Sequence, residues 1–312
     1  MLTRRTALFS AMAAGGCASV GHTGEPLDAR FRNLETFSES VHSGVTSEDG
    51  QLRLTVRLCR YPELGLAWVW IHARTPEGFF SYVDHLAPAH EQAPVSVGRI
   101  YADDAQSLVF ERLGAVDKPT SARITGSCLA RRTTTSAFGK GEHRMDVSIA
   151  FSPERLYSGL NKGRTEVFGH SRAVVTIDGR QTVIEGPAQF HEQGQTTPRF
   201  TAPFSYMTLW GSGAATTMLI APKRRDGYLL EGDATTEVTS VTVDPPAPVR
   251  QLHVKLADGR ELDGEATLVQ AYTIPMVGNT WRGHMMNVQL GGRSYRGHIN
   301  DYIIGDGVPY TG

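Results

Sequence analysis

The sequence predicts an all-β protein built from barrels or sandwiches. Short runs of alternating apolar and polar residues recur along the chain, and a high content of turn formers separates them, with 33 Gly and 16 Pro among 312 residues. Helical periodicity is nearly absent, because only Ala102–Leu113 reads as an amphipathic segment, and that segment also suits a strand. Strands separated by turns about every 8–12 residues are typical of sandwiches and barrels.

The first predicted strands follow one another closely. Alternation over Gln51–Cys59 predicts a strand with one buried face. The turn Pro62–Gly65 leads into a second strand, Leu66–Ala73, and the turn Pro76–Gly78 leads into a third, Phe79–Asp84. The second strand places three ring side chains on one face, namely Trp68, Trp70 and His72.

Asp-Gly pairs predict hairpin turns further along the chain. Asp178–Gly179 lies between the alternating runs Ala173–Ile177 and Thr182–Glu185. Both turn residues tolerate positive φ, which a tight hairpin requires. We expect the same device at Asp226–Gly227 and Asp258–Gly259.

The N-terminus resembles a bacterial export signal. Residues 1–17 contain Arg4 and Arg5, then a mildly apolar stretch, and end in small residues before Cys17, as in a twin-arginine signal with a lipobox. We expect lipidation of Cys17, with residues 18–35 as a polar tether and the protein in the periplasm or cell envelope. Cleavage with secretion, or an ordinary cytosolic N-terminus, are the alternatives.

The remaining chain divides into two halves of similar size. A turn-rich stretch near 152–165 predicts a first unit at 36–158 and a second at 159–312, each the size of one antiparallel barrel. An up-and-down barrel of this size can hold an apolar ligand in its mouth.

Composition and missing motifs exclude several functions. A formal net charge of −1 without a basic block argues against nucleic acid as a partner. The sequence has no Walker loop, no Gly-x-Ser-x-Gly elbow and no dinucleotide fingerprint, and neither His-Glu-Gln stretch has the second His of a zincin helix. We therefore predict no cofactor and no metal. Cys59 and Cys128 can pair in an oxidising compartment, but Cys59 also suits a small buried apolar position.

Motifs in both halves resemble the double lipocalin-like family of hydroxyneurosporene synthase (carotenoid 1,2-hydratase), kievitone hydratase and the lipocalin-like Diels–Alderases. These motifs are Arg57–Pro62, Trp68–Trp70, Thr75–Gly78, Tyr82, Val167–His170, Val174–Gly179, Glu185–Gly194 and Tyr295–Tyr302. His191 and Gly194 match the family's Asp-His-x-Trp-Gly turn, whereas Phe190 and Gln193 depart from it. The resemblance implies two lipocalin-like antiparallel barrels packed together.

Two acid–histidine pairs are the candidate catalytic residues, namely Asp84 with His85 and His191 with Glu192. In an apolar cavity a desolvated carboxyl stays protonated and can donate its proton to an alkene or carbonyl, while the imidazole positions water. The alternative is that both pairs are turn residues bound to backbone amides. Because neighbouring strand residues face opposite sides, only one member of each pair can point inward.

Aromatic residues are the candidate ligand-binding residues: Trp68, Trp70, Phe79, Tyr82, Tyr206, Trp210 and Trp281. The alternative is that they are ordinary core residues. In the stretch from Pro203 to Trp210, alternation places Phe204, Tyr206 and Thr208 on the same face as Trp210.

The resemblance implies a cofactor-independent hydratase or cyclase that acts on a lipophilic, isoprenoid-like or polyketide-like small molecule. A non-catalytic carrier of hydrophobic ligands is the alternative, since a barrel cavity binds by apolar burial alone. A purely structural interaction module would have filled barrels and no pocket.

Overall fold

A computed structural model describes residues 38–89, 99–103, 106–115, 118–134, 141–158, 163–196, 200, 202–276 and 279–304. Within these ranges every regular element is a strand, apart from one short 3-10 helix, η1 (Pro62–Leu64), so the predicted all-β class is confirmed. The predicted export signal with Cys17 and the predicted tether lie outside the described residues. No helix in the described ranges is long and apolar enough to cross a membrane.

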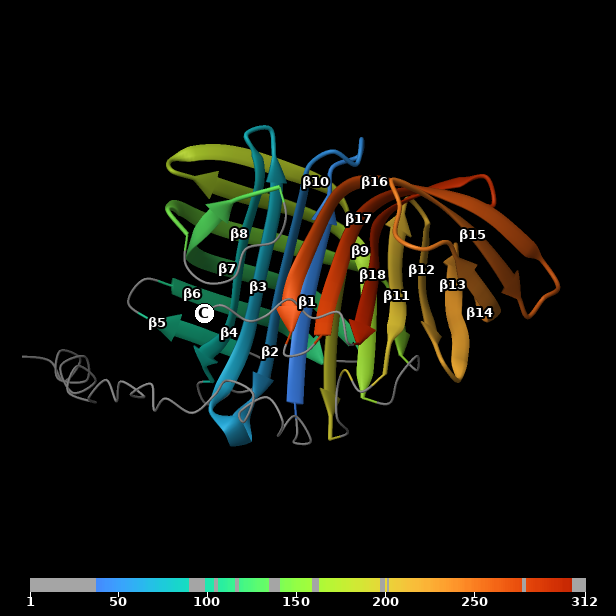
Figure 1. Ribbon diagram of the computed structural model, residues 1–312, viewed down its shortest axis with the longest axis horizontal. Helices are drawn as coiled ribbons and strands as arrows, with labels where there is room; N and C mark the ends of the chain where they lie inside the picture. The colour runs from blue at the N-terminus through green and yellow to red at the C-terminus, as the bar shows by residue number, and fades with distance from the viewer. Residues whose placement is uncertain are drawn as a thin grey trace, which may run out of the picture. The chain divides into compact units, whose positions relative to one another are not determined.

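Ten strands form the first sheet, in the spatial order β4-β3-β2-β1-β10-β9-β8-β7-β6-β5 (Figure 1). Their bounds are β1 (Ser38–Thr46), β2 (Arg53–Tyr61), β3 (Leu66–Thr75), β4 (Gly78–Pro88), β5 (Arg99–Asp103), β6 (Gln106–Ala115), β7 (Lys118–Arg132), β8 (His143–Ser158), β9 (Arg164–Ile177) and β10 (Arg180–Gln195). A further pairing of β4 with β7, through Phe80 and Ser81, closes eight of these strands into a ring. The hairpin of β5 and β6 continues the sheet beyond β7.

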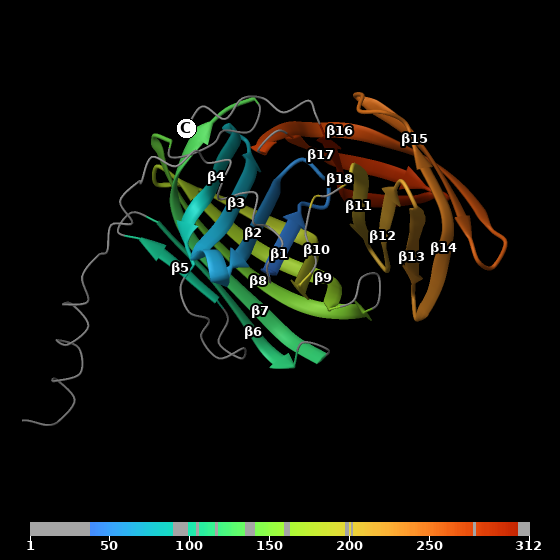
Figure 2. The ribbon, with the colours of Figure 1, turned by 60° about the horizontal axis from the view of Figure 1, so that its bottom comes forward.

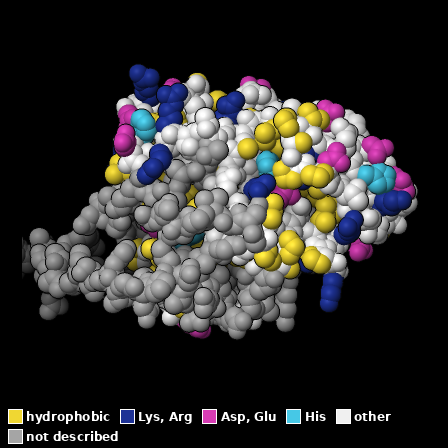
Figure 3. Space-filling model, viewed as in Figure 1, with side chains coloured by type: hydrophobic (Ala, Val, Ile, Leu, Met, Phe, Trp, Pro, Cys, Tyr) yellow, Lys and Arg dark blue, Asp and Glu magenta, His cyan; other side chains and the backbone are white. Residues whose placement is uncertain are grey.

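The remaining strands form a closed antiparallel barrel, drawn from yellow to red in Figures 1 and 2. Their bounds are β11 (Phe204–Gly211), β12 (Ala214–Ala221), β13 (Arg224–Glu231), β14 (Ala234–Val243), β15 (Val249–Leu256), β16 (Glu261–Met276), β17 (Asn279–Leu290) and β18 (Arg293–Ile304). Each strand pairs with its neighbour in sequence, and β18 returns to β11. The structure therefore has the two packed antiparallel barrels that the sequence predicted. Basic and acidic side chains lie interspersed over the side of the second barrel seen in Figure 3.

The change from one sheet to the other lies later in the chain than the sequence predicted. Strands β9 and β10 pair within the first sheet, so that sheet extends to Gln195 and not to residue 158. The second barrel begins at Phe204. A turn-rich stretch between two paired strands has the same composition as a linker between domains, which explains the misplaced boundary at 159.

Two of the three predicted Asp-Gly turns are confirmed. Asp178 and Gly179 join β9 to β10 with φ of 48° and 84°, and Asp258 and Gly259 lie between β15 and β16. Asp226–Gly227 instead lies inside β13, and a Cβ at Gly227 would lie 2.2 Å from the Thr217 carbonyl oxygen on β12. This glycine allows close approach of two strands rather than a turn. The segment Ala102–Leu113 falls on β5 and β6 and is not helical.

Each barrel is filled by its own apolar side chains. The first core contains Val41, Leu54, Val69, Ile149 and Phe190, among others, and the second contains Met207, Leu229, Val254, Met286 and Ile299, among others. Because side chains alternate along a strand, the residues between these core positions point outward. Cys59 and Cys128 are both buried and unpaired with each other, which rules out the disulfide in this structure.

Arg53 on β2 joins the outer surface of the first barrel to the second. Its guanidinium donates to the carbonyl oxygens of Gly297 and Met286, each at 2.9 Å, and to Asn287 Oδ1 at 2.6 Å. Burial, with Arg296 and Arg74 nearby, lowers the pKa of Arg53 to about 9. These bonds satisfy carbonyl groups that would otherwise be sealed from water between the barrels.

We expect Arg53→Met to lower the free energy of unfolding by about 2 kcal/mol, because it leaves buried acceptors without donors. Urea unfolding measures this change, and Arg172→Met is the control, since Arg172 is exposed on β9. Equal stability of the two variants would show that Arg53 does not hold the barrels together.

Candidate functional site

A cavity of about 270 Å³ lies between the outward faces of the two barrels. On β1, Val41 joins the first core while its neighbour His42 lines the cavity. On β11, Met207 joins the second core while Tyr206 lines the cavity. The cavity is therefore not the barrel mouth that the sequence suggested, because apolar side chains fill both interiors and only the outward residues remain to form a site.

Aromatic rings form much of the cavity wall. Its aromatic lining residues are Trp70, Phe200, Phe204, Tyr206, Tyr272 and Trp281. The ring centroids of Trp70 and Trp281 are 5.4 Å apart, and those of Phe204 and Trp281 are 5.8 Å apart, so the two barrels share one aromatic cluster. The Arg57 guanidinium lies 4.3 Å above the Trp70 ring, which is close enough for a cation–π interaction. Such a wall suits a flat or lipophilic molecule.

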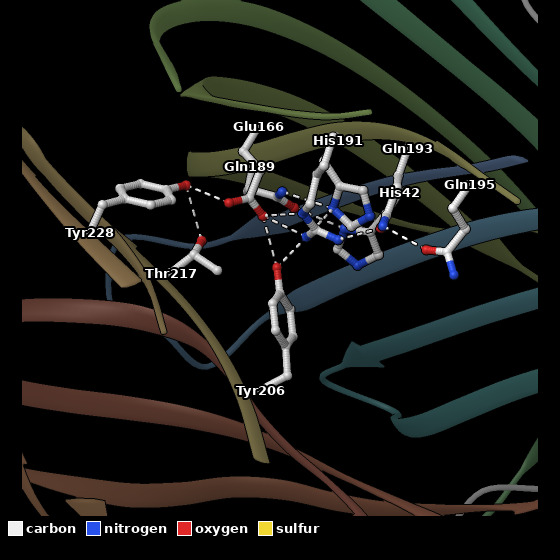
Figure 4. A network of polar contacts seen from close by, with 10 residues as sticks. His42, Glu166, Gln189, His191, Gln193, Gln195, Tyr206, Thr217 and Tyr228 are labelled. Atoms are coloured by element: carbon white, nitrogen blue, oxygen red, sulfur yellow. Dashed lines mark hydrogen bonds and ion pairs between the residues drawn. The ribbon is translucent and has the colours of Figure 1, made fainter. Parts of the chain in front are cut away.

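Arg164, which lines this cavity, forms a buried ion pair with Glu166. Figure 4 shows Glu166 between Tyr228 and the two histidines, His42 and His191. Arg164 Nη2 lies 2.5 Å from Glu166 Oε1, and the Glu166 side chain is 1% exposed. Tyr206 donates to Glu166 Oε1 at 2.8 Å, and Tyr228 donates to Oε2 at 2.5 Å. Burial alone would raise the pKa of Glu166, but the charge of Arg164 and the hydrogen bonds outweigh burial and lower it. Glu166 is thus an ionised carboxylate and not a proton donor.

Two stacked histidines lie next to this ion pair, and both line the cavity. The rings of His42 on β1 and His191 on β10 have centroids 4.9 Å apart and planes inclined by 17°. Gln189 bridges them, with Oε1 2.8 Å from His42 Nδ1 and Nε2 3.0 Å from His191 Nδ1. Burial, followed by smaller effects that include Arg57 and Arg164, lowers the pKa of His42 to about 4. His42 is therefore neutral at pH 7.

Further residues that line the cavity have buried polar atoms without a hydrogen-bond partner in the protein. His72 Nε2, His298 Nδ1 and Asn300 Oδ1 are among the buried atoms of described lining residues that make no hydrogen bond within the protein. Burial lowers the pKa of His72 to about 3 and that of His298 well below its usual value. Because buried polar atoms are normally satisfied, these groups are available to a polar part of a ligand or to water.

Only one of the four predicted catalytic residues lines the cavity. His191 does, whereas its neighbour Glu192 points to the other face of β10 and pairs with Arg112 at 2.7 Å. Asp84 accepts hydrogen bonds from the Tyr82 hydroxyl at 3.0 Å and the Leu86 amide at 2.7 Å. These contacts agree with the alternative interpretation, in which the carboxylate is bound by nearby groups of its own strand. His85 is buried behind Trp70, whose Nε1 donates to His85 Nε2 at 2.8 Å.

The predicted aromatic residues divide in a similar way. Trp70, Tyr206 and Trp281 line the cavity. The others lie elsewhere: Trp68 stacks on His85, Phe79 lies beside His72 and Tyr272, Tyr82 is in the first core, and Trp210 donates to Thr46 Oγ1. As predicted, Phe204, Tyr206 and Thr208 share one face of β11, and that face lines the cavity.

The sequence interpretation missed most of the polar network, namely His42, Arg164, Glu166, Gln189 and Tyr228. A signal was present on β10, because Gln189 and Gln193 lie two residues from His191 and so share its face. Their partners come from β1, β9 and β13, and strand pairing over such distances is not readable from local pattern. Among the described residues, no group of three or more His, Cys, Asp or Glu side chains is arranged to hold a metal ion.

We expect the folded protein to lose stability as the pH falls from about 6.5 toward 4. Burial lowers the pKa of His42 to about 4 and of His72 and His85 to about 3, so the unfolded chain takes up protons in this interval that the folded chain does not. Each such histidine lowers the free energy of unfolding by about 1.4 kcal/mol for each pH unit in this interval.

Urea unfolding at pH 7 and pH 5 measures this loss. The variant His72→Gln should have a shallower pH dependence than the wild type, while the control Thr235→Ala, at an exposed position without a titratable group, should keep the wild-type slope. Stability that stays constant between these pH values would contradict the assignment of neutral buried histidines.

Comparisons with known proteins bear on the fold. No protein-family model matches the chain, and no curated protein does. Solved structures do match: CghA with Sch210972 has a TM-score of 0.59 and 12% identity over 88% of this chain and 90% of its own. A Nitrosomonas europaea protein assigned as AttH has a TM-score of 0.57 and 10% identity over 90% of this chain and 96% of its own. Kievitone hydratase from Nectria haematococca superposes less well, with a TM-score of 0.45 and 9% identity over 88% of this chain and 90% of its own. The chain has the double lipocalin-like fold that its motifs resemble.

Proposed function

We propose that this protein is a cofactor-independent hydratase or cyclase that acts on a lipophilic small molecule held between the two barrels. One observation carries the proposal: the stacked pair of His42 and His191 lies in the wall of an aromatic cavity. A neutral imidazole in such a place can accept a proton from water or from substrate and return it. The fold adds support, because the similar CghA was crystallised with a small molecule, Sch210972.

The source of the proton differs from the one that the sequence suggested. No Asp or Glu is among the described residues that line the cavity, and the nearby Glu166 is held ionised. The chemistry proposed here therefore rests on histidines and on the charge of Arg57 and Arg164, not on a protonated carboxyl group. The substrate is isoprenoid-like or polyketide-like, and the aromatic wall would hold it by apolar burial.

We expect His42→Ala to reduce turnover by about 100-fold or more while ligand binding persists, since general acid–base groups contribute factors of this size. Native mass spectrometry of the protein from its own host, with organic extraction, identifies a bound molecule to test as substrate. The control His143→Ala changes a histidine outside the cavity.

Full turnover in both His191→Ala and His42→Ala would refute the assignment of these two histidines as the catalytic groups. A molecule that co-purifies but is never converted by the wild type would identify a carrier of hydrophobic ligands instead. An empty protein that binds no terpenoid, carotenoid or fatty acid would favour an interaction module.

We also propose that the protein is exported and lipid-anchored through Cys17, with residues 18–35 as the tether. A lipophilic substrate dissolved in a membrane would then lie near the cavity. In cell fractionation, the wild type should be in the membrane fraction and Cys17→Ser in the soluble fraction, while the control Cys59→Ser should behave as the wild type. Recovery of all three proteins from the cytoplasm would contradict export.

A further inference from the structure

We propose that Gln189 holds His42 and His191 in opposite tautomers, so that His42 presents an unprotonated Nε2 as base and His191 presents Nε2–H as hydrogen-bond donor. This inference rests on the proposed function for its chemistry, but the tautomers themselves are fixed by contacts within the protein. Gln189 is a positioning residue, because it is fully buried and acts through the two histidines.

Arg164 carries a charged guanidinium, and this charge fixes the protonation of its neighbour His191. Arg164 Nη2 donates to Glu166 Oε1 and to the Tyr206 hydroxyl, and it also lies 3.3 Å from His191 Nδ1. A guanidinium has N–H donors and no acceptor, so a proton on His191 Nδ1 would face another donor. Glu166 further favours the charged guanidinium, because its attraction outweighs the effect of burial and raises the pKa of Arg164. His191 Nδ1 is therefore unprotonated, and the neutral ring carries its proton on Nε2.

The orientation of the Gln189 amide follows from this tautomer. The side-chain nitrogen of Gln189 lies 3.0 Å from His191 Nδ1 and donates to it. A flipped amide would put two acceptors face to face, because its oxygen would then meet the unprotonated Nδ1. Through its effect on His191, Arg164 thus determines that the nitrogen of the Gln189 amide points toward His191.

The other end of the amide sets the tautomer of His42. Gln189 Oε1 can only accept, and it lies 2.8 Å from His42 Nδ1, which must therefore be the donor. A neutral His42 with its proton on Nδ1 has a lone pair on Nε2. The result is one acceptor ring and one donor ring, stacked with centroids 4.9 Å apart in the same cavity wall.

This arrangement suits a substrate with a carbonyl group conjugated to a carbon–carbon double bond. Water, or a hydroxyl group of the same molecule, attacks the far carbon of the double bond and forms a C–O bond, while its proton passes to His42 Nε2. The electrons of the double bond move to the carbonyl oxygen, which accepts a hydrogen bond from His191 Nε2–H. His42 then returns the proton to the carbon next to the carbonyl.

The two possible nucleophiles correspond to the two proposed reactions. Water as nucleophile makes the step a hydration, and an internal hydroxyl makes it a ring closure. An isolated alkene would instead need a strong acid, and no carboxyl is among the described residues that line the cavity. The substrate class is therefore an unsaturated carbonyl compound.

Long-range proton–nitrogen NMR correlation of the ¹⁵N-histidine-labelled full chain at pH 7 tests the tautomers without any substrate. We expect Nδ1–H for His42 and Nε2–H for His191 in the wild type. In Gln189→Met, His42 should shift to Nε2–H because it loses its acceptor, while His191 should stay unchanged because Arg164 remains. Gln189→Glu should keep His42 as Nδ1–H, since a carboxylate still accepts.

His85 is the internal control for the fold of each variant. Trp70 donates to its Nε2, so His85 should remain Nδ1–H throughout. A wild-type His42 with its proton on Nε2, or a His42 that Gln189→Met leaves unchanged, would overturn the inference.

Adding a lipophilic unsaturated ketone to the wild type tests the chemistry separately. The His191 Nε2–H signal should shift, whereas the saturated hydrocarbon of the same size should not move it. If the tautomers are as stated but no ketone shifts this signal, the catalytic assignment is overturned. If the ketone binds as expected and no product forms, the proposed function fails while the tautomer assignment stands.

Discussion

The ion pair of Arg164 and Glu166 is the interaction on which the polar arrangement of the cavity depends. Two charges buried between barrels are costly unless each is paired and hydrogen-bonded. Here Glu166 pairs with Arg164 and accepts hydrogen bonds from the hydroxyls of Tyr206 and Tyr228, so strands of both barrels contribute to its environment. Because Arg164 stays charged, the orientation of each successive group in the network, from His191 through Gln189 to His42, is determined.

Strand alternation explains why the site lies between the barrels. The inward positions of both barrels are occupied by apolar side chains, so the polar and aromatic residues can only point outward. On an isolated barrel these residues would face water, where an imidazole keeps its ordinary pKa. Packing of the second barrel against the first removes that water, and burial lowers the pKa values of His42, His72 and His298.

Local pattern was enough to predict the strands β2, β3 and β4 and the hairpin turn at Asp178–Gly179, because each depends on residues adjacent in the chain. It was not enough to place β9 and β10 in the first sheet, since that depends on pairing of β10 with the distant β1. For the site, alternation correctly separated His191 from Glu192. It could not show that a second barrel covers the His191 face, and so the ligand was expected in a barrel mouth.

The proposed function requires that ligands bind between the barrels and not inside one of them. A crystal structure with the molecule that co-purifies from the host tests this claim most directly. We expect ligand density against Trp70, Tyr206 and Trp281, with a polar group of the ligand near His42 and His191. Density inside either barrel, with apolar core residues such as Met286 or Phe190 displaced, would contradict it.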